Sequence, residues 1–328
     1  MYSPGDYLWM IADEARVDAY AGALRALIRP GDIVLDIGAG FGFFSVIAAR
    51  QGAGHVHAVD TNPAIHLGPH VATANRCADL ITFHHCDAAS LQLSQPADLV
   101  ISDLRGATPF SRRSLAVIAD ARRRLARPGA TFIAASDTLL AAPCRAPATF
   151  RHDVQAVHIR ADLDLSAVER VVFDTPLRCT IDPDDLLAPG EPWCRLCYTS
   201  LEATDHTGEQ RWTLGRDGRM DGVAVWFSTD LGAGIGFSSA PGSAVQTYRQ
   251  TFLPLRTSIP LAVGDMIRIL LNVRLVGRDY IWEWQVWMTP KNSHSERQIA
   301  HQNSLAELVI DPAALRTASV RGIAATDV

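Results

Sequence analysis

Long apolar runs are absent from this sequence of 328 residues. No segment approaches the ~20 consecutive apolar residues that a membrane-spanning helix needs, so we expect no contact with a membrane. The opening residues include acidic side chains and no basic cluster, which is unlike a secretory signal peptide. We therefore expect a cytoplasmic protein.

An excess of positive charge and a dense set of cysteines are also missing. The chain has 30 lysines and arginines against 35 acidic residues, a net charge of −5, which argues against a nucleic-acid partner. Its six cysteines are too sparse for a disulfide scaffold. Cys194 and Cys197 form one C-x-x-C pair, but no second pair completes a zinc site, so we expect no metal.

The most informative feature that is present is a glycine-rich turn at Val34–Gly42, which reads VLDIGAGFG. An apolar run leads into Asp36, glycines follow at Gly38, Gly40 and Gly42, and an amphipathic helix comes next. This order predicts a strand, a tight turn and a helix, as at the start of a nucleotide-binding α/β unit. Glycine lets backbone amides approach a ligand closely. We expect Asp36 and the glycines to shape a cofactor-binding turn.

Two later acids complete the predicted cofactor site. Asp60 ends the next strand, near the ~20-residue offset expected for a carboxylate that binds ribose hydroxyls. The G-x-G-x-G spacing differs from the G-x-G-x-x-G of dinucleotide enzymes, and a single ribose without a pyrophosphate fits S-adenosylmethionine. Asp87 follows the third strand and is predicted either to contact the adenine amino group or to cap the next turn.

Strands and helices alternate as far as about residue 135, and this predicts an α/β fold with a mostly parallel, Rossmann-like sheet. Beyond about residue 138, short alternating strands between turn signals predict an antiparallel, β-barrel-like domain. We expect a helical lid at residues 1–28, a cofactor-binding domain at 29–138 and the barrel-like domain at 139–328. No structure is predicted after about Thr289. The expected strands of the first sheet are Ile33–Ile37, His55–Val59, Ile81–His84, Leu99–Ser102 and Thr131–Ala134. The expected helices are Met10–Leu27, Phe44–Gln51, Ile65–Arg76 and Arg113–Leu125.

The chain resembles the protein arginine methyltransferases along most of its length. Met10–Arg16 is similar to the family's M-L-x-D-x-x-R segment, Asp221–Phe227 to its h-A-h-x-Y-F strand and Gly236–Pro241 to its G-F-S-T-x-P turn. The resemblance implies a class I S-adenosylmethionine-dependent methyltransferase. It also implies that Arg16 binds the carboxylate of the cofactor. A guanidinium can donate two parallel hydrogen bonds to the two oxygens of a carboxylate. An arm near residues 150–187 is implied to pair two subunits into a homodimer.

One family motif is altered. The family binds a substrate guanidinium between two glutamates of S-E-W-M-G-x-x-x-x-x-E, whereas this chain has Asp103 at the first position and Arg112 at the second. No other acid occurs before Asp120, and Arg105 lies between the two positions. A cation in place of an acid about 4 Å from a guanidinium changes the interaction by roughly 4 kcal/mol for each sign, at an effective dielectric constant near 20. This argues against peptidyl arginine as the substrate.

The sequence therefore predicts methyl transfer to a small molecule with an anionic or polar handle, most plausibly in specialised metabolism. Asp103 would orient the acceptor or take its proton. Arg105 or Arg112 would bind a carboxylate or phosphate of this substrate.

Three more residues are expected at the acceptor site, and two other functions stay open. Tyr7 is an aromatic residue of the lid, and Thr247 and Tyr248 stand where the family has T-H-W. The first alternative is an arginine N-methyltransferase in which Asp103 alone holds the guanidinium of free or peptidyl arginine. The second is a non-catalytic dimeric scaffold with a methyltransferase fold.

Overall fold

The computed structural model describes residues 2–160 and 164–305. Its first sheet has five parallel strands in the order β3-β2-β1-β4-β5, so the strand order reverses between β1 and β4. The strands are β1 (Ile33–Ile37), β2 (His55–Asp60), β3 (Ile81–His85), β4 (Ala97–Ser102) and β5 (Ala126–Ile133). The last four residues of β1 are buried, as expected for a central strand covered on both faces.

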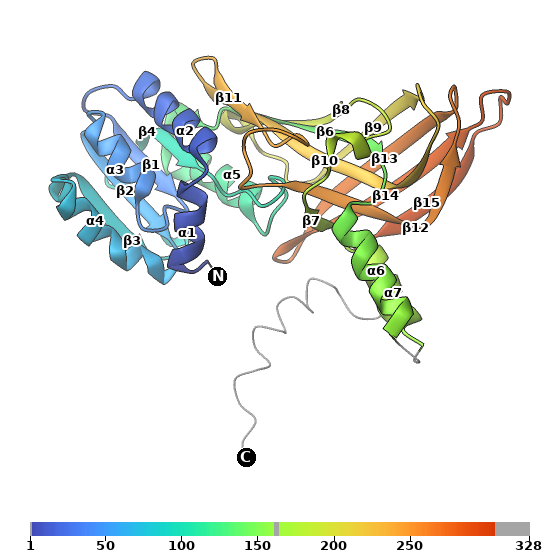
Figure 1. The fold of residues 1–328 in the computed structure, drawn as a ribbon. Helices are drawn as coiled ribbons and strands as arrows, with labels where there is room; N and C mark the ends of the chain where they lie inside the picture. The colour runs from blue at the N-terminus through green and yellow to red at the C-terminus, as the bar shows by residue number, and fades with distance from the viewer. Residues whose placement is uncertain (1, 161–163, 306–328) are drawn as a thin grey trace.

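The helices of the first half cover this sheet (Figure 1). They are α1 (Pro4–Ile11), α2 (Glu14–Leu27), α3 (Phe43–Arg50), α4 (Gly68–Ala74) and α5 (Ser114–Arg124). Short 3₁₀ turns lie at η1 (Pro63–Leu67), η2 (Ala78–Leu80), η3 (Ala88–Ser90), η4 (Pro183–Asp185) and η5 (Tyr198–Ser200). No helix in the described part of the chain is long and apolar enough to cross a membrane.

The predicted single helix Met10–Leu27 is wrong, because two helices occupy this region. The side chain of Asp13 accepts a hydrogen bond from the backbone N–H of Arg16 and so caps the second helix, α2. The first helix, α1, begins after Ser3, whose side chain forms a capping box with Asp6. Both caps are local signals that the apolar periodicity alone did not reveal.

The second half forms two antiparallel sheets, and the predicted fold class is confirmed. One sheet has the order β7-β12-β10-β6-β8 with β11 beside β10, and the other has the order β15-β14-β13-β9. The strands are β6 (Ser136–Cys144), β7 (Leu177–Cys179), β8 (Glu191–Cys197), β9 (His206–Thr213), β10 (Gly218–Gly232), β11 (Ile235–Ser238), β12 (Gln250–Leu261), β13 (Met266–Val276), β14 (Asp279–Thr289) and β15 (Arg297–Asn303). Strand β15 lies in the stretch for which no structure was predicted, and 306–328 lies outside the described residues.

Two helices, α6 (Ala148–Arg160) and α7 (Ser166–Phe173), project from the second half of the chain (Figure 1). We call this segment the arm. It falls within the stretch where a dimerisation arm was predicted. Residues 161–163, between the two helices, lie outside the described residues.

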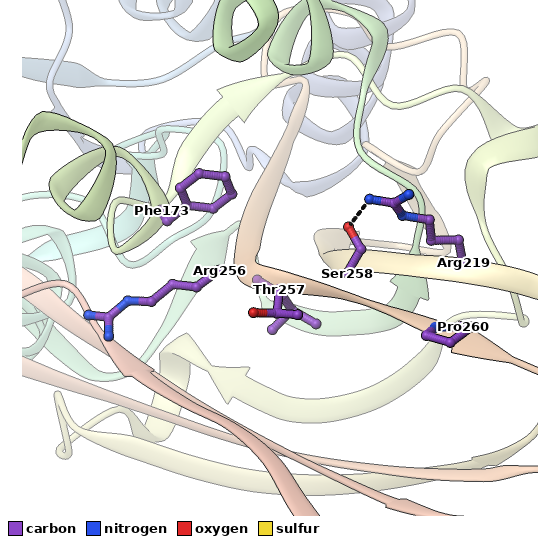
Figure 2. Close-up of a pocket in the computed structure, with 7 residues that line it drawn as sticks. Phe173, Arg219, Arg256, Thr257, Ser258 and Pro260 are labelled. Carbon is purple, nitrogen blue, oxygen red and sulfur yellow. Dashed lines mark hydrogen bonds between the residues drawn. The ribbon is translucent and has the colours of Figure 1, made fainter. Parts of the chain in front are cut away.

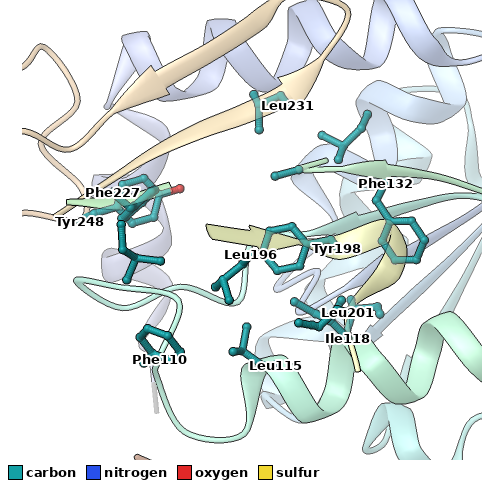
Figure 3. Close-up of a cluster of buried hydrophobic side chains, with 14 of the residues drawn as sticks. Phe110, Leu115, Ile118, Phe132, Leu196, Tyr198, Leu201, Phe227, Leu231 and Tyr248 are labelled. Atoms are coloured by element: carbon teal, nitrogen blue, oxygen red, sulfur yellow. The ribbon is translucent and has the colours of Figure 1, made fainter. Parts of the chain in front are cut away.

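One hydrophobic core joins the two halves. Figure 3 shows Phe132 of β5 and Ile118 of α5 packed near Tyr198 and Leu196, which come from the second half of the chain. Because this junction is buried, it fixes the end of β4 relative to strand β10. The candidate site lies beside this junction.

Candidate functional site

The glycine turn follows β1 at the point where the strand order reverses, which is where open α/β sheets bind ligands. Gly38, Gly40 and Gly42 all have positive φ angles, of 77°, 58° and 83°. The backbone N–H groups of Gly38 and Ala39 donate to the carbonyl of Val59 in β2, at 2.8 and 3.2 Å. The turn is therefore held against the neighbouring strand, as the sequence predicted for a cofactor-binding turn.

Asp60, at the end of β2, is bound directly to this turn. One carboxylate oxygen accepts the N–H of Gly40 at 2.7 Å, and the other accepts the N–H of Asn62 at 2.7 Å. Two fixed donors hold the carboxylate at the edge of the turn. Binding of ribose hydroxyls by this carboxylate stays a prediction.

Asp36 and Asp87 make contacts within the protein. Asp36 is buried in β1 and accepts a hydrogen bond from the hydroxyl of Ser45 in α3 at 2.6 Å. Burial raises the pKa of Asp36 to about 7, although the Ser45 hydrogen bond opposes this effect. Asp87 is exposed and caps η3 by accepting the N–H of Ala89 at 2.9 Å. Capping was one of its two predicted roles, and adenine contact stays a prediction.

Neighbouring side chains pack closely against the turn because its glycines have no Cβ atoms. A Cβ atom added to Gly38 would lie 2.5 Å from Cδ2 of Leu104, and one added to Gly40 would clash with Cε1 of Tyr7. Tyr7 therefore covers the turn from helix α1, where its ring also packs against Phe41 at 5.6 Å. These residues fit a bound nucleoside-type cofactor.

Replacing Gly40 with alanine is expected to weaken S-adenosylmethionine binding at least about tenfold, or 1.4 kcal/mol. The added Cβ forces Tyr7 away from the turn and occupies the approach to the backbone. Isothermal titration measures the effect. Gly277→Ala is the matched control, because Gly277 has a similar φ of 64° but nothing within 4 Å. Both variants suffer left-handed strain of about 1–2 kcal/mol. Equal cofactor affinities in the two would contradict the assignment.

Asp103 lies just after β4 at the centre of a charged network. Arg16 donates to it from Nη2 at 2.5 Å and from Nε at 3.0 Å, and Arg105 donates from Nη1 at 3.0 Å. The hydroxyl of Tyr248 contacts both carboxylate oxygens at 2.8 Å. Burial disfavours the anion, but the two guanidinium groups outweigh burial and lower the pKa of Asp103 to about 2. Asp103 is therefore an anion at neutral pH.

Arg105 has no capacity left for a substrate anion, which corrects its predicted role. Its five N–H donors are all used: Nε and Nη2 bind the two oxygens of Asp137 at 2.8 Å each. Nη2 also donates to Thr229, and Nη1 donates to Tyr20 and Asp103. The charge of Arg105 is thus largely neutralised by a fully buried carboxylate.

Arg112 does not enter this network, and the predicted repulsion of a substrate cation is therefore wrong. Its side chain is exposed, where water and ions screen its charge. The structure gives Arg112 neither a hydrogen bond nor an ion pair with any described residue. Its predicted contact with a substrate anion stays without structural support.

The Thr247–Tyr248 segment is held against the lid. Asp13 accepts the backbone N–H groups of Gln246 and Thr247 at 2.8 and 2.7 Å. The hydroxyl of Thr247 is buried and has no hydrogen-bond partner among the described residues. Burial raises the pKa of Tyr248, so its hydroxyl stays protonated and can donate to Asp103. The structure thus brings the predicted residues Arg16, Asp103 and Tyr248 together.

Residues that the sequence reasoning missed support this arrangement. Asp137 lies in β6 and Tyr198 in η5, and the hydroxyl of Tyr198 donates to Asp137 at 2.6 Å. No local motif connects these elements to Asp103. Asp13 lies within the M-L-x-D-x-x-R-like segment, so the motif was a usable signal for it. Arg178 of β7 donates from Nε to the carbonyl of Tyr248 at 3.1 Å and from Nη2 to that of Thr247.

A cavity of about 160 Å³ lies beside the network, between the loop after β4 and the second half of the chain. Residues of the loop from Gly106 to Ser111 form one wall, and Arg178, Asp279 and Tyr280 contribute to the others. The hydroxyl of Tyr280 is buried and has no hydrogen-bond partner in the described part of the chain. Asp103 is not itself in the lining, but the loop that forms one wall begins three residues after it.

A larger hollow of about 550 Å³ lies near the end of α7 and along β12 (Figure 2). Arg219 and Arg256 line it, and Asp221 and Asp174 neutralise these cations at 3.1 and 2.5 Å. None of the predicted site residues lines this hollow. The smaller cavity, by contrast, is bounded by the loop that follows Asp103 in the chain.

The cysteine pair and the histidines form no metal centre in the described residues. No group of three or more His, Cys, Asp or Glu side chains there could hold a metal ion. Cys194 is half-buried and Cys197 is exposed, and both are free thiols on β8. Residues three apart on a strand point to opposite faces, so this pair is not arranged to chelate.

Comparisons with known proteins agree with this geometry. A family model described as a methyltransferase domain matches residues 34–129, and one described as an arginine methyltransferase oligomerization subdomain matches 136–285. An arginine N(omega)-methyltransferase of Streptomyces achromogenes subsp. streptozoticus is 27% identical over 274 residues, which is 80% of this chain and 74% of the relative. Protein arginine N-methyltransferase 1 of Schizosaccharomyces pombe is 27% identical over 275 residues, 79% of this chain and 78% of the relative.

A solved structure has the same fold. The Trypanosoma brucei PRMT1 enzyme–prozyme complex with AdoHcy superimposes with a TM-score of 0.81 at 20% identity, covering 92% of this chain and 98% of that chain. The prediction of a small-molecule acceptor with an anionic handle is wrong, because the relatives are named for arginine methylation. The expected link to specialised metabolism rested on that acceptor. The relatives are named as enzymes, so the scaffold alternative has no support either.

Proposed function

We propose that this chain, a class I S-adenosylmethionine-dependent methyltransferase similar to the protein arginine methyltransferases, methylates a guanidino nitrogen of arginine. The observation that carries the proposal is the state of Asp103. It is a buried carboxylate at the sheet edge beside the cofactor turn, it is ionised, and two guanidinium groups already bind it. Asp103 is therefore an anion that binds guanidinium groups, and a substrate guanidinium would take the place of one of the contacts that it makes here.

The single carboxylate is sufficient because the expected opposing charges are not in place. Asp137 neutralises Arg105, and Arg112 is exposed to solvent. An arginine side chain always carries its proton at ordinary pH, so its binding needs a local anion. Asp103 supplies that anion, and the Tyr248 hydroxyl fixes the orientation of the carboxylate.

Arg16 is placed to serve the cofactor and Asp103 together. Its Nε and Nη2 bind Asp103, and Nη1 donates to the carbonyl of Met10 at 3.2 Å. The described residues leave one N–H on each terminal nitrogen, and these would bind the cofactor carboxylate. The glycine turn would receive the nucleoside part, and Asp60 would bind its ribose hydroxyls.

The chemistry follows from this placement. S-adenosylmethionine, when bound, supplies an electrophilic methyl group on a sulfonium. Asp103 would hold the acceptor guanidinium so that one nitrogen faces that methyl group in line. Hydrogen bonds to the carboxylate would draw positive charge away from the attacking nitrogen, and the proton that this nitrogen loses would pass to water, because Asp103 has a pKa of about 2 and would not retain it.

The test is methyl transfer from labelled S-adenosylmethionine to free arginine and to arginine-glycine peptides. Mass spectrometry of the products should show methylarginine in at least one of the two. A chain that binds the cofactor but methylates no guanidine compound would contradict the proposal.

We also propose a homodimer paired through the arm. The family model described as an oligomerization subdomain includes α6 and α7. Val168 of α7 has 55% of its surface exposed, so the arm carries an apolar side chain that a second subunit would cover. Light scattering after size exclusion should give twice the mass of 35.6 kDa, and Val168→Asp should lower it.

A further inference from the structure

The cavity that the loop after β4 bounds has one cation in its wall, Arg178. Two backbone carbonyls, those of Thr247 and Tyr248, are the hydrogen-bond partners that the structure gives this guanidinium. Arg178 forms no ion pair with a described residue, unlike Arg16 and Arg105. Its pKa is lowered, first by burial and also by the neighbouring cation of Arg249. Arg178 is therefore a cation in the cavity wall that is not ion-paired with any described carboxylate.

The cavity has an additional unsatisfied polar group. Tyr280 lines it and is 2% exposed, and its hydroxyl has no partner among the described residues. A buried hydroxyl without a hydrogen bond is destabilising, so such groups commonly contact a ligand or water. Asp279, the other charged residue of the lining, carries the opposite sign to Arg178.

Tyr248 connects this cation to the acceptor site. Its backbone carbonyl accepts from Arg178, and its hydroxyl contacts Asp103. One tyrosine residue therefore contacts both charged residues. An arginine molecule carries the two complementary groups, a guanidinium at one end and an α-carboxylate at the other.

We propose that Arg178 binds the α-carboxylate of the acceptor arginine while Asp103 holds its guanidinium, so that the enzyme selects arginine with a free carboxylate. This inference rests on the proposed function. Free arginine and the last residue of a peptide share this chemistry, whereas arginine inside a peptide lacks it. A guanidinium fork is suited to bidentate binding of a carboxylate.

The experiment compares four acceptors with the full chain and S-adenosylmethionine. They are free L-arginine, agmatine (which lacks the carboxylate), a peptide ending in arginine with a free carboxylate, and the same peptide as its C-terminal amide. We expect kcat/KM to be about 10- to 100-fold higher for an acceptor with the carboxylate than for its partner without it, as for one charged hydrogen-bonded contact. Comparison of kcat/KM between free L-arginine and the peptide that ends in arginine shows which of these two carboxylate-bearing acceptors the enzyme prefers.

Arg178→Gln should remove this preference. The 10- to 100-fold preference for each carboxylate-bearing acceptor over its partner without the carboxylate should fall to about one in this variant, through a rise in KM for the carboxylate-bearing acceptors. Arg216→Gln is the matched control, because Arg216 also donates from Nη2 to two backbone carbonyls, those of Asp184 and Leu186, but does not line this cavity. It should leave all four values unchanged.

The outcomes separate the two proposals. If agmatine and the amide peptide are methylated with the same kcat/KM as their carboxylate-bearing partners, this inference is wrong, whereas the proposal of arginine methylation stands. If Arg178→Gln lowers the rate equally on all four acceptors, Arg178 does not bind the α-carboxylate of the acceptor. If none of the four is methylated by enzyme that binds the cofactor, the proposed function fails as well.

Discussion

Asp103→Asn should reduce methyl transfer about a thousandfold and weaken S-adenosylmethionine binding far less, through the contact of Asp103 with Arg16. The substitution keeps the shape of the side chain but removes the anion that holds the acceptor. A unit charge pair at about 4 Å contributes roughly 4 kcal/mol at an effective dielectric constant near 20, and each 1.36 kcal/mol changes a rate tenfold. Steady-state kinetics give the rate, and isothermal titration gives the cofactor affinity.

Two controls make the Asp103 result specific. Asp103→Glu keeps the charge, and the protein arginine methyltransferases that the chain resembles have glutamate at this position, so activity should stay well above that of Asp103→Asn. Asp120→Asn removes an acid of α5 that pairs with Arg124, and it should leave activity unchanged. If Asp103→Asn keeps more than about a tenth of the activity, the acceptor is held elsewhere.

The cofactor half of the site was largely predictable from the sequence. An apolar strand, a run of spaced glycines and an acid about 20 residues later form a local pattern, and each part has its own conformational reason. The structure gives Gly38 and Gly40 positive φ angles and binds Asp60 to the turn. Helix ends were less predictable, since Asp13 divides the expected helix through a single cap.

The acceptor half was not predictable because it depends on partners far apart in the chain. Arg105 and Arg112 are both arginines of the loop after β4, and the sequence does not distinguish their roles. Arg105 is buried and binds Asp137, 32 positions away, whereas Arg112 is exposed. Counting acids in the loop therefore gave the wrong charge for the site. Asp137 lies in an apolar strand, β6, where nothing nearby in the sequence indicates an arginine partner.

Arg105→Met should lower the free energy of unfolding by about 3–5 kcal/mol, because it leaves the carboxylate of Asp137 buried without its cation. The side chains of Arg105 and Asp137 are 3% and 0% exposed. Chemical denaturation measures the change. Arg122→Met breaks an ion pair with Glu202, whose side chain is 80% exposed, and should cost no more than about 1 kcal/mol. Equal losses in the two variants would contradict a special role for the buried pair.

The double variant Arg105→Met with Asp137→Asn separates stability from activity. Without the buried anion, the variant should be more stable than Arg105→Met alone, because no uncompensated charge remains and the amide oxygen of the new side chain would still accept from Tyr198. Activity should not recover with stability, since Arg105 also holds Asp103 in place through its Nη1. A double variant that regains both would show that Arg105 only neutralises Asp137, and that Arg16 and Tyr248 alone position the acceptor carboxylate.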